Sequence, residues 1–187
     1  GVIDGVTHKN AIVSVDDVDG MHKGYAIHIG HGVYISLKHV LTGNARILSE
    51  EPKGITISGE LATFRLNNIL PTAVPVGTNK PIKDPWGNPV STDWQFKNYN
   101  TTSGNIYGAC GSSCSLTRQG DCGLPYVDDH GVVVGLHAGS GGDKCPSRKL
   151  IVPYVKVDMR IRDTCTKESP TKTHKPTFSY RGLLGKE

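Results

Sequence analysis

Apolar residues occur along this chain in short runs that are bounded by Gly, Asn, Asp or Pro. The runs are rich in Val, Ile and aromatic residues, which favour strands. None of them continues at the spacing of about 3.6 residues that marks an amphipathic helix. The pattern therefore predicts an all-β chain with strands over residues 11–15, 24–29, 33–36, 55–66, 104–110, 124–127, 132–137 and 150–155.

Glycines mark two places where the pattern predicts a change of chain direction. Gly30-His31-Gly32 separates the runs 24–29 and 33–36, and a tight turn between two such runs is typical of a β-hairpin. Gly59 interrupts the partial alternation of residues 55–66, where we expect a bend.

Residues 71–90 differ in composition from the segments on either side. Five of the eleven prolines fall there, interspersed with Gly and Asn. Proline lacks the N–H that a central strand needs, so we expect a connector between two lobes. The predicted division is a β lobe over 1–70, the connector over 71–90, a second β lobe over 91–162 and an extended basic tail over 163–187.

Composition and charge narrow the class of protein only slightly. The 187 residues carry a net charge of +4, which permits contact with nucleic acid without indicating it. No apolar run approaches the roughly 20 residues needed to span a bilayer, and the first residues lack the layout of a signal peptide. The chain starts with Gly in place of Met, so we expect it to be excised from a longer one.

The five cysteines are an odd number, and no secretory signal accompanies them. Reduced thiols in a cytosolic setting therefore fit better than a disulfide framework. Cys110 and Cys114 have a loose zinc-ligand spacing, but no second close pair follows, so we expect no metal.

Cys122 stands out because Gly120-Asp121 precedes it and Gly123 follows it. A thiol becomes a strong nucleophile when a base or a positive field removes its proton, and acyl transfer also needs N–H groups directed at an oxyanion. Glycines on both sides allow a sharp turn and leave the N–H groups of Gly120 and Cys122 accessible. The same composition is compatible with a tight turn that holds a buried cysteine.

A nucleophilic cysteine needs a base from elsewhere in the chain, which contains eight histidines. His39 follows the predicted strand 33–36 and leads into a loop, where a base that faces a cleft between two lobes would lie. Its position alone is also compatible with a surface histidine. His28 and His137 belong to apolar runs, either as core histidines or as part of a substrate site.

Three blocks of this sequence resemble the chymotrypsin-like cysteine proteases of positive-strand RNA viruses. GDCGLPY with the later VGLHAG is similar to their nucleophile region, and YAIHIGHGVYISLKHV (25–40) resembles the histidine block of the calicivirus branch. SGELATFR (58–65) looks like the block that carries the acidic residue. The blocks occur in the order His, acid, Cys, and the resemblance extends over about residues 11–160. The connector and SYRGLL (179–184) look most like the vesivirus group.

The resemblance implies a chymotrypsin-like fold of two antiparallel β-barrels with the active site in the cleft between them. It makes His39 the general base, Cys122 the nucleophile and Glu60 the acid that orients the imidazole. Glu50 and Glu51 remain rival acids, although both lie in a turn-like stretch.

The resemblance also implies the residues that bind substrate. The backbone N–H groups of Gly120 and Cys122, with Asp121 as a further candidate, form the oxyanion hole. Thr117 and His137 match the positions that line the specificity pocket and hold a Glu or Gln side chain before the scissile bond.

Physical chemistry supports the same preference. Leu116 stands where a basic-specific protease of this fold carries a carboxylate, so a buried Lys or Arg of the substrate would lack its counter-charge. Thr117 and His137 offer donors to an oxygen instead, and we expect cleavage after Glu, with Gln tolerated. If the His137 ring is charged, the preference for Glu should shrink as the pH rises.

The resemblance therefore implies a viral cysteine endopeptidase that processes its own polyprotein through an acyl-enzyme, without metal or organic cofactor. The expected partners are the viral polyprotein, viral RNA and a polymerase fused downstream, and the expected location is the host cell cytoplasm, at viral replication sites. The alternative is a viral RNA-binding module whose protease activity is secondary. Its basic residues are scattered, however, and no aromatic stacking platform is evident.

Overall fold

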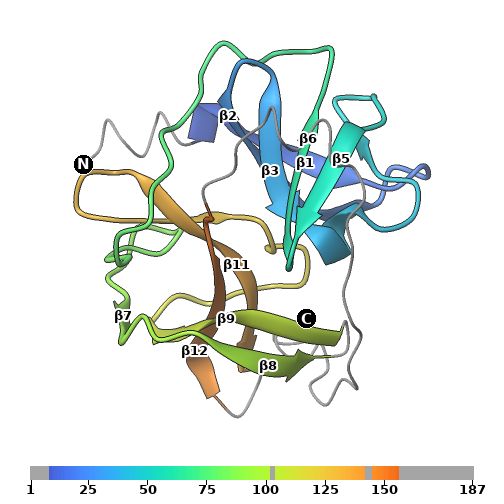
Figure 1. Ribbon diagram of the computed structural model, residues 1–187. Helices are drawn as coiled ribbons and strands as arrows, with labels where there is room; N and C mark the ends of the chain where they lie inside the picture. Colours follow the sequence, from blue (N-terminus) through green and yellow to red (C-terminus); the bar gives the residue numbers. More distant parts are fainter. Residues whose placement is uncertain (1–8, 102–103, 142–144, 156–187) are drawn as a thin grey trace.

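A computed structural model of the chain describes residues 9–101, 104–141 and 145–155 (Figure 1). Its strands form two antiparallel sheets, each curled into a half-barrel, which confirms the predicted all-β class. Within these ranges, no helix has the length and apolarity needed to cross a bilayer. The predicted tail, 163–187, lies outside the described residues.

The first sheet has the spatial order β4-β1-β2-β3-β6-β5. The predicted hairpin is present, because β2 pairs with β3 across a turn in which His31 has a φ of 54°. Residues 55–66, expected as one bent strand, belong instead to two antiparallel strands that are joined at Gly59 and Glu60. The strands are β1 (Ile12–Asp16), β2 (His22–Gly30), β3 (Val33–Leu37), β4 (Arg46–Ile47), β5 (Lys53–Ser58) and β6 (Leu61–Arg65).

The second sheet has the order β10-β11-β12-β9-β7, and β8 pairs with β9 outside this path. The predicted runs correspond to four of its strands, but β8, with the sequence KNYNT, was not predicted. Its residues lack an apolar alternation, and pairing with β9 supplies the hydrogen bonds that make it a strand. The strands are β7 (Ser91–Thr92), β8 (Lys97–Thr101), β9 (Gly104–Ser112), β10 (Pro125–Val127), β11 (Val133–Gly141) and β12 (Cys145–Pro153).

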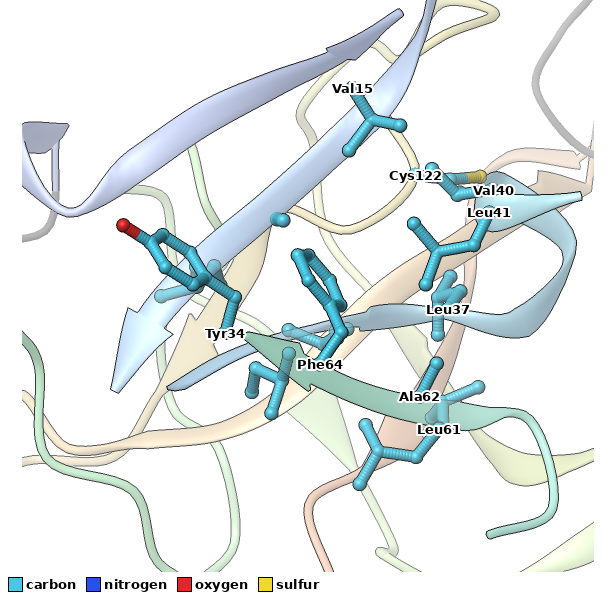
Figure 2. Packing of buried hydrophobic residues seen from close by; sticks show 14 of the residues in the cluster. Val15, Tyr34, Leu37, Val40, Leu41, Leu61, Ala62, Phe64 and Cys122 are labelled. Atoms are coloured by element: carbon cyan, nitrogen blue, oxygen red, sulfur yellow. The ribbon is translucent and has the colours of Figure 1, made fainter. Parts of the chain in front are cut away.

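One buried apolar cluster extends through both sheets (Figure 2). Tyr34 and Phe64 stack in the first sheet with ring centroids 5.7 Å apart, and Val133 and Leu136 enter the same cluster from the second sheet. Each large side chain buried in this way contributes about 1.5–3 kcal/mol. The shared core therefore fixes how the two sheets face one another.

The proline-rich segment 71–90 lies against both sheets. The Val74 N–H donates to the His28 carbonyl oxygen of β2 at 3.1 Å, and Val76 forms a bridge with Val133 of β11. The segment is therefore packed structure, while the limits 1–70, 71–90 and 91–162 stay a prediction.

Candidate active site

His39 follows the one fully buried strand of the first sheet. All five residues of β3 are buried, and the chain continues into a short 3-10 helix, η1 (Lys38–Leu41). Val40 and Leu41 are buried and anchor this helix on the core. The His39 side chain beside them is 12% exposed, so its ring is held in place yet keeps some access to solvent.

Glu60 reaches His39 because of the register between β3 and β6. Leu37 lies opposite Leu61, which places the β5–β6 turn beside the start of η1. Gly59 has a φ of 64° at the first central position of that turn, which matches a type II′ hairpin. Glu60 Oε2 accepts hydrogen bonds from His39 Nδ1 and from the His39 backbone N–H, the latter at 3.0 Å. A carboxylate on Nδ1 orients the ring and leaves Nε2 for proton transfer.

The rival acids have other partners. Glu50 accepts hydrogen bonds from the backbone N–H groups of residues 67 and 68, both at 2.7 Å, and these bonds lower the pKa of its carboxyl. Glu51 is exposed and pairs with an arginine of β4 at 2.9 Å. Of the three acids, Glu60 is the one that the structure brings to His39.

Two successive turns shape the loop that carries Cys122. The first closes between residues 118 and 121 with an N–H···O distance of 3.1 Å, and the second between residues 121 and 124 at 3.3 Å. Gly120 and Gly123 occupy the third positions of these turns with φ of 97° and 100°, as type II turns require. The two glycines therefore allow the double turn that presents Cys122 between them.

The first sheet holds this loop through its backbone. The Tyr25 N–H of β2 donates to the Cys122 carbonyl oxygen at 2.8 Å. A Cβ at Gly123 would lie 2.1 Å from the Tyr25 carbonyl oxygen, so only glycine permits this approach. Cys122 is 1% exposed and belongs to the same apolar cluster as Val40, the residue after His39 (Figure 2). The candidate nucleophile and base therefore converge where the two sheets join.

The electrostatic environment keeps Cys122 protonated before substrate binds. Burial raises the pKa of its thiol well above the ordinary range, and the negative charges of Glu60 and Asp121 act in the same direction. The thiol therefore needs a base at the moment of attack, because a preformed thiolate is disfavoured.

One of the three expected oxyanion donors, the Asp121 amide, already has a hydrogen-bond acceptor in the structure. The Asp121 N–H donates to the Arg118 carbonyl oxygen at 3.1 Å, and the Asp121 carboxylate accepts from the Arg118 N–H at 2.8 Å. Asp121 therefore closes the first turn, where its amide N–H already has an acceptor, and the assignment of Gly120, Asp121 and Cys122 to the oxyanion hole stays a prediction. Gly120 and Cys122 remain the candidate donors.

His137 lies within β11 and is fully buried. Burial lowers the pKa of its ring to about 3, and the electrostatic effects of Lys149 and His39 act in the same direction, so the ring is neutral at neutral pH. The Tyr126 hydroxyl lies 2.9 Å from Nδ1. If that hydroxyl donates, the ring hydrogen resides on Nε2, for which no described residue serves as an acceptor. A buried N–H in this state is suited to an oxygen of a substrate.

Thr117, the other expected specificity residue, is half-buried in the loop between β9 and β10. Among the described contacts, no hydrogen bond joins it to His137. The preceding Leu116 is 78% exposed, so it forms no apolar floor beneath the His137 ring.

Two residues of the proline-rich segment also belong to this part of the site, although the sequence pattern did not reveal them. Trp86 packs edge-to-face on the His137 ring, with centroids 5.4 Å apart. Asp84 is 3% exposed and accepts hydrogen bonds of 2.7 and 2.5 Å from two serine hydroxyls of residues 113–117. The sequence DPWGN identifies a turn, but no local pattern connects that turn with His137.

Sequence comparison identifies relatives of this chain. Residues 24–128 match the model of the 2C endopeptidase (C24) cysteine protease family. The chain is 52% identical to the genome polyprotein of Feline calicivirus over 181 residues, which is 96% of this chain and 10% of that polyprotein. The chain therefore spans about a tenth of the length of the curated relative that it matches.

Solved structures of proteases share the fold. A protease from M. tuberculosis in its active form aligns with a TM-score of 0.64 at 13% identity, covering 92% of this chain and 88% of that one. The murine norovirus NS6 protease, an inactive mutant with an altered cleavage junction, aligns with a TM-score of 0.58 at 18% identity, covering 86% and 97%. At these identities the likeness concerns the fold, and it supports the chymotrypsin-like architecture that the sequence predicts.

Proposed function

Because the chain belongs to the 2C endopeptidase (C24) cysteine protease family and is a chymotrypsin-fold cysteine endopeptidase, we propose that it cleaves a calicivirus polyprotein at Glu-containing junctions. The observation that carries the proposal is the hydrogen-bonded pair of His39 and Glu60 beside the Cys122 turn. This arrangement combines an oriented base with a nucleophile in one site.

The reaction begins when Cys122 Sγ attacks the carbonyl carbon of the substrate and His39 Nε2 takes the thiol proton. Glu60 accepts from His39 Nδ1 and so stabilises the imidazolium that forms. The C–N bond then breaks, the leaving amine takes the proton from His39, and a thioester remains on Cys122. Water attacks this thioester with His39 as base, which releases the new carboxyl end and restores the thiol.

The negative oxygen of the tetrahedral intermediate needs donors on the loop before Cys122. The backbone N–H groups of Gly120 and Cys122 serve this purpose, on either side of the Asp121 residue that closes the turn. The donors are fixed by the two type II turns, so they need little rearrangement during the reaction.

Specificity resides at His137, with Thr117 as a second donor. The neutral ring offers Nε2–H to a carboxylate or amide oxygen of the residue before the cleaved bond. The Lys149 ammonium, which acts on the His137 ring, contributes a positive potential that favours Glu over Gln. Trp86 covers one side of the ring and restricts how the substrate side chain enters.

The test is a set of peptides that differ only in the residue before the scissile bond: Glu, Gln, Asp, Lys and Leu. We expect the largest kcat/KM with Glu, a smaller value with Gln, and little cleavage of the other three. Incubation with the polyprotein precursor, followed by sequencing of the new amino termini, locates the junctions. Efficient cutting after Lys or Leu would overturn the specificity assignment.

A further inference from the structure

We propose that His22, a residue of β2 with no assigned role, positions the oxyanion hole by holding the Gly120 carbonyl group. The proposal rests on the proposed protease function. His22 Nε2 lies 2.8 Å from the Gly120 carbonyl oxygen, 98 positions away along the chain, and so links β2 with the loop between β9 and β10. His22 does not touch the reacting atoms, so it is a positioning residue.

In the hydrogen bond between His22 and Gly120, His22 must be the donor. A carbonyl oxygen accepts hydrogen bonds and cannot donate them, so His22 Nε2 must carry the hydrogen. On the other side of the ring, Nδ1 lies 2.7 Å from the Ser14 hydroxyl oxygen, and that hydroxyl is 2.6 Å from Asp16 Oδ1. A hydroxyl carries one hydrogen. If the Ser14 hydroxyl donates to Asp16, it accepts from Nδ1–H and the ring carries both hydrogens; if the ring is neutral, the hydroxyl donates to Nδ1 in place of Asp16. Nε2 keeps its hydrogen in both arrangements.

The orientation of Gly120 needs such a restraint. Glycine is required there, since its φ is 97°, but a glycine also has more backbone freedom than any other residue. The His22 contact fixes its carbonyl oxygen, and the Asp121 N–H of the same peptide group is fixed by Arg118 at 3.1 Å. The Gly120 N–H belongs to the preceding peptide group, which is linked to the held one through the φ and ψ of Gly120. Holding the following peptide restrains these angles, so the N–H keeps the direction that the type II turn gives it.

The packing around the ring supports the same role. A Cβ at Gly120 would lie 2.8 Å from His22 Cδ2 and 3.3 Å from Nε2, so the ring lies directly against the Gly120 backbone. Tyr25 supports the ring edge-on with centroids 4.6 Å apart. The side chain of His22 is 36% exposed, so its substitution leaves no buried cavity.

The experiment compares three variants, His22→Ala, His22→Gln and Ser14→Ala, with the wild type. It measures stabilisation of the oxyanion separately from the reactivity of the Cys122 nucleophile. Three quantities are measured: kcat and KM on the Glu peptide, the inhibition constant of a peptide aldehyde, and the rate of Cys122 alkylation by iodoacetamide. The aldehyde forms a hemithioacetal whose oxygen occupies the oxyanion site, whereas alkylation develops no such oxygen. His130→Ala is the control, since the side chain of that histidine is exposed and pairs with the neighbouring Asp129, away from the Gly120 loop, while its hydrogen bond to Asp128 uses only the backbone.

For His22→Ala we expect kcat to fall roughly ten- to a hundred-fold with KM changed less than about twofold, because the lost interaction acts in the transition state. The aldehyde should bind more weakly by a similar factor, and the alkylation rate should stay at the wild-type value. His22→Gln should recover most of the loss, because its amide N–H₂ can donate to the same carbonyl. Ser14→Ala should show a smaller loss of the same kind.

Two results would overturn the proposal. One is a His22→Ala enzyme with wild-type kcat and aldehyde affinity. The other is a parallel fall in kcat, alkylation rate and thermal stability that His22→Gln does not recover, which indicates a general structural role. If the wild-type chain itself cleaves none of the peptides, the proposed protease function fails instead, and the two failures are thereby distinguished.

Discussion

The candidate site has two halves, the pair of His39 and Glu60 and the pair of Cys122 and His137, and they differ in which charge state their surroundings favour. In one half, His39 of η1 and Glu60 of the β5–β6 turn form a hydrogen-bonded pair whose side chains are 12% and 8% exposed. In the other half, Cys122 of the β9–β10 loop and His137 of β11 are buried, and burial favours the neutral form of both by raising the pKa of the thiol and lowering that of the imidazole. When the Cys122 thiol gives its proton to His39, the positive charge of the imidazolium is therefore stabilised by Glu60, which already contacts His39.

The comparison also concerns how each half is built. The His39 half depends on a side-chain contact between η1 and one hairpin turn. The Cys122 half depends on backbone geometry, since two glycine turns and the Tyr25 N–H hold the nucleophile. Side-chain substitutions should accordingly remove single functions from the first half, whereas backbone changes should disturb the second half as a whole.

The strongest test removes the nucleophile of the buried half. We expect Cys122→Ala to abolish peptide cleavage while the thermal unfolding midpoint stays near that of the wild type, because a small buried side chain is lost without a new polar group. Cys122→Ser should fold but cleave very slowly, since a buried hydroxyl needs more help from the base. Full proteolysis by Cys122→Ala would remove Cys122 from its role.

The next test compares the contributions of His39 and Glu60 to kcat/KM. His39→Ala should lower kcat/KM by about 10²–10⁴-fold, the usual contribution of general acid–base catalysis. Glu60→Ala should lose less, because it only orients and stabilises a base that serves an intrinsically nucleophilic sulfur. Glu50→Ala and Glu51→Ala are the controls. A control that loses more activity than Glu60→Ala would transfer the role of the acid.

A smaller effect is expected at the specificity residue. His137→Ala removes one donor to the substrate side chain, and we expect kcat/KM on the Glu peptide to fall roughly 10- to 100-fold, or about 1–3 kcal/mol. Tyr126→Phe, which removes only the hydroxyl 2.9 Å from His137 Nδ1, should lose less. Unchanged preference in the His137→Ala enzyme would contradict the assignment of His137.

The neutral state of Cys122 can be measured through alkylation. Because its pKa is raised, the thiolate fraction is small at neutral pH, and the rate of iodoacetamide reaction should keep increasing above about pH 10, where an unfolded cysteine with a pKa of about 8.5 has reached its plateau. Mass spectrometry assigns the alkylated residue, and the urea-unfolded chain is the reference. A plateau at mildly acidic pH would instead indicate a preformed thiolate–imidazolium pair and would break the contrast between the two halves.

The smallest expected effect is the absence of a pH trend in specificity. With a ring pKa of about 3, His137 stays neutral from about pH 6 to about pH 9, so the ratio of kcat/KM for Glu and Gln peptides should be constant there. A ratio that falls as the pH rises would mean that bound Glu recruits a proton to the ring. That outcome would place a charge in the buried half as well.

Local features of the fold could be predicted from the sequence. Strand periodicity and the glycine turn at His31 depend on neighbouring residues alone, so β2, β3 and their hairpin were predicted with nearly correct bounds. The strand β8 was missed because its polar residues carry no alternation, and only β9 makes it a strand. The break at Gly59 was expected, but its consequence, a hairpin turn with Glu60 at its end, required the pairing of β5 with β6.

The sequence by itself determined most of the strands, a sharp turn at Cys122 and the resemblance to a family, because φ preferences, alternation and motif spacing act over a few residues. Tertiary structure decided which distant groups meet: Glu60 with His39 over 21 positions, and His22 with Gly120 over 98. It also gave the Asp121 N–H an acceptor within its own turn, the Arg118 carbonyl oxygen. Such contacts depend on strand register and on how two sheets pack around one core, which are properties of the whole chain.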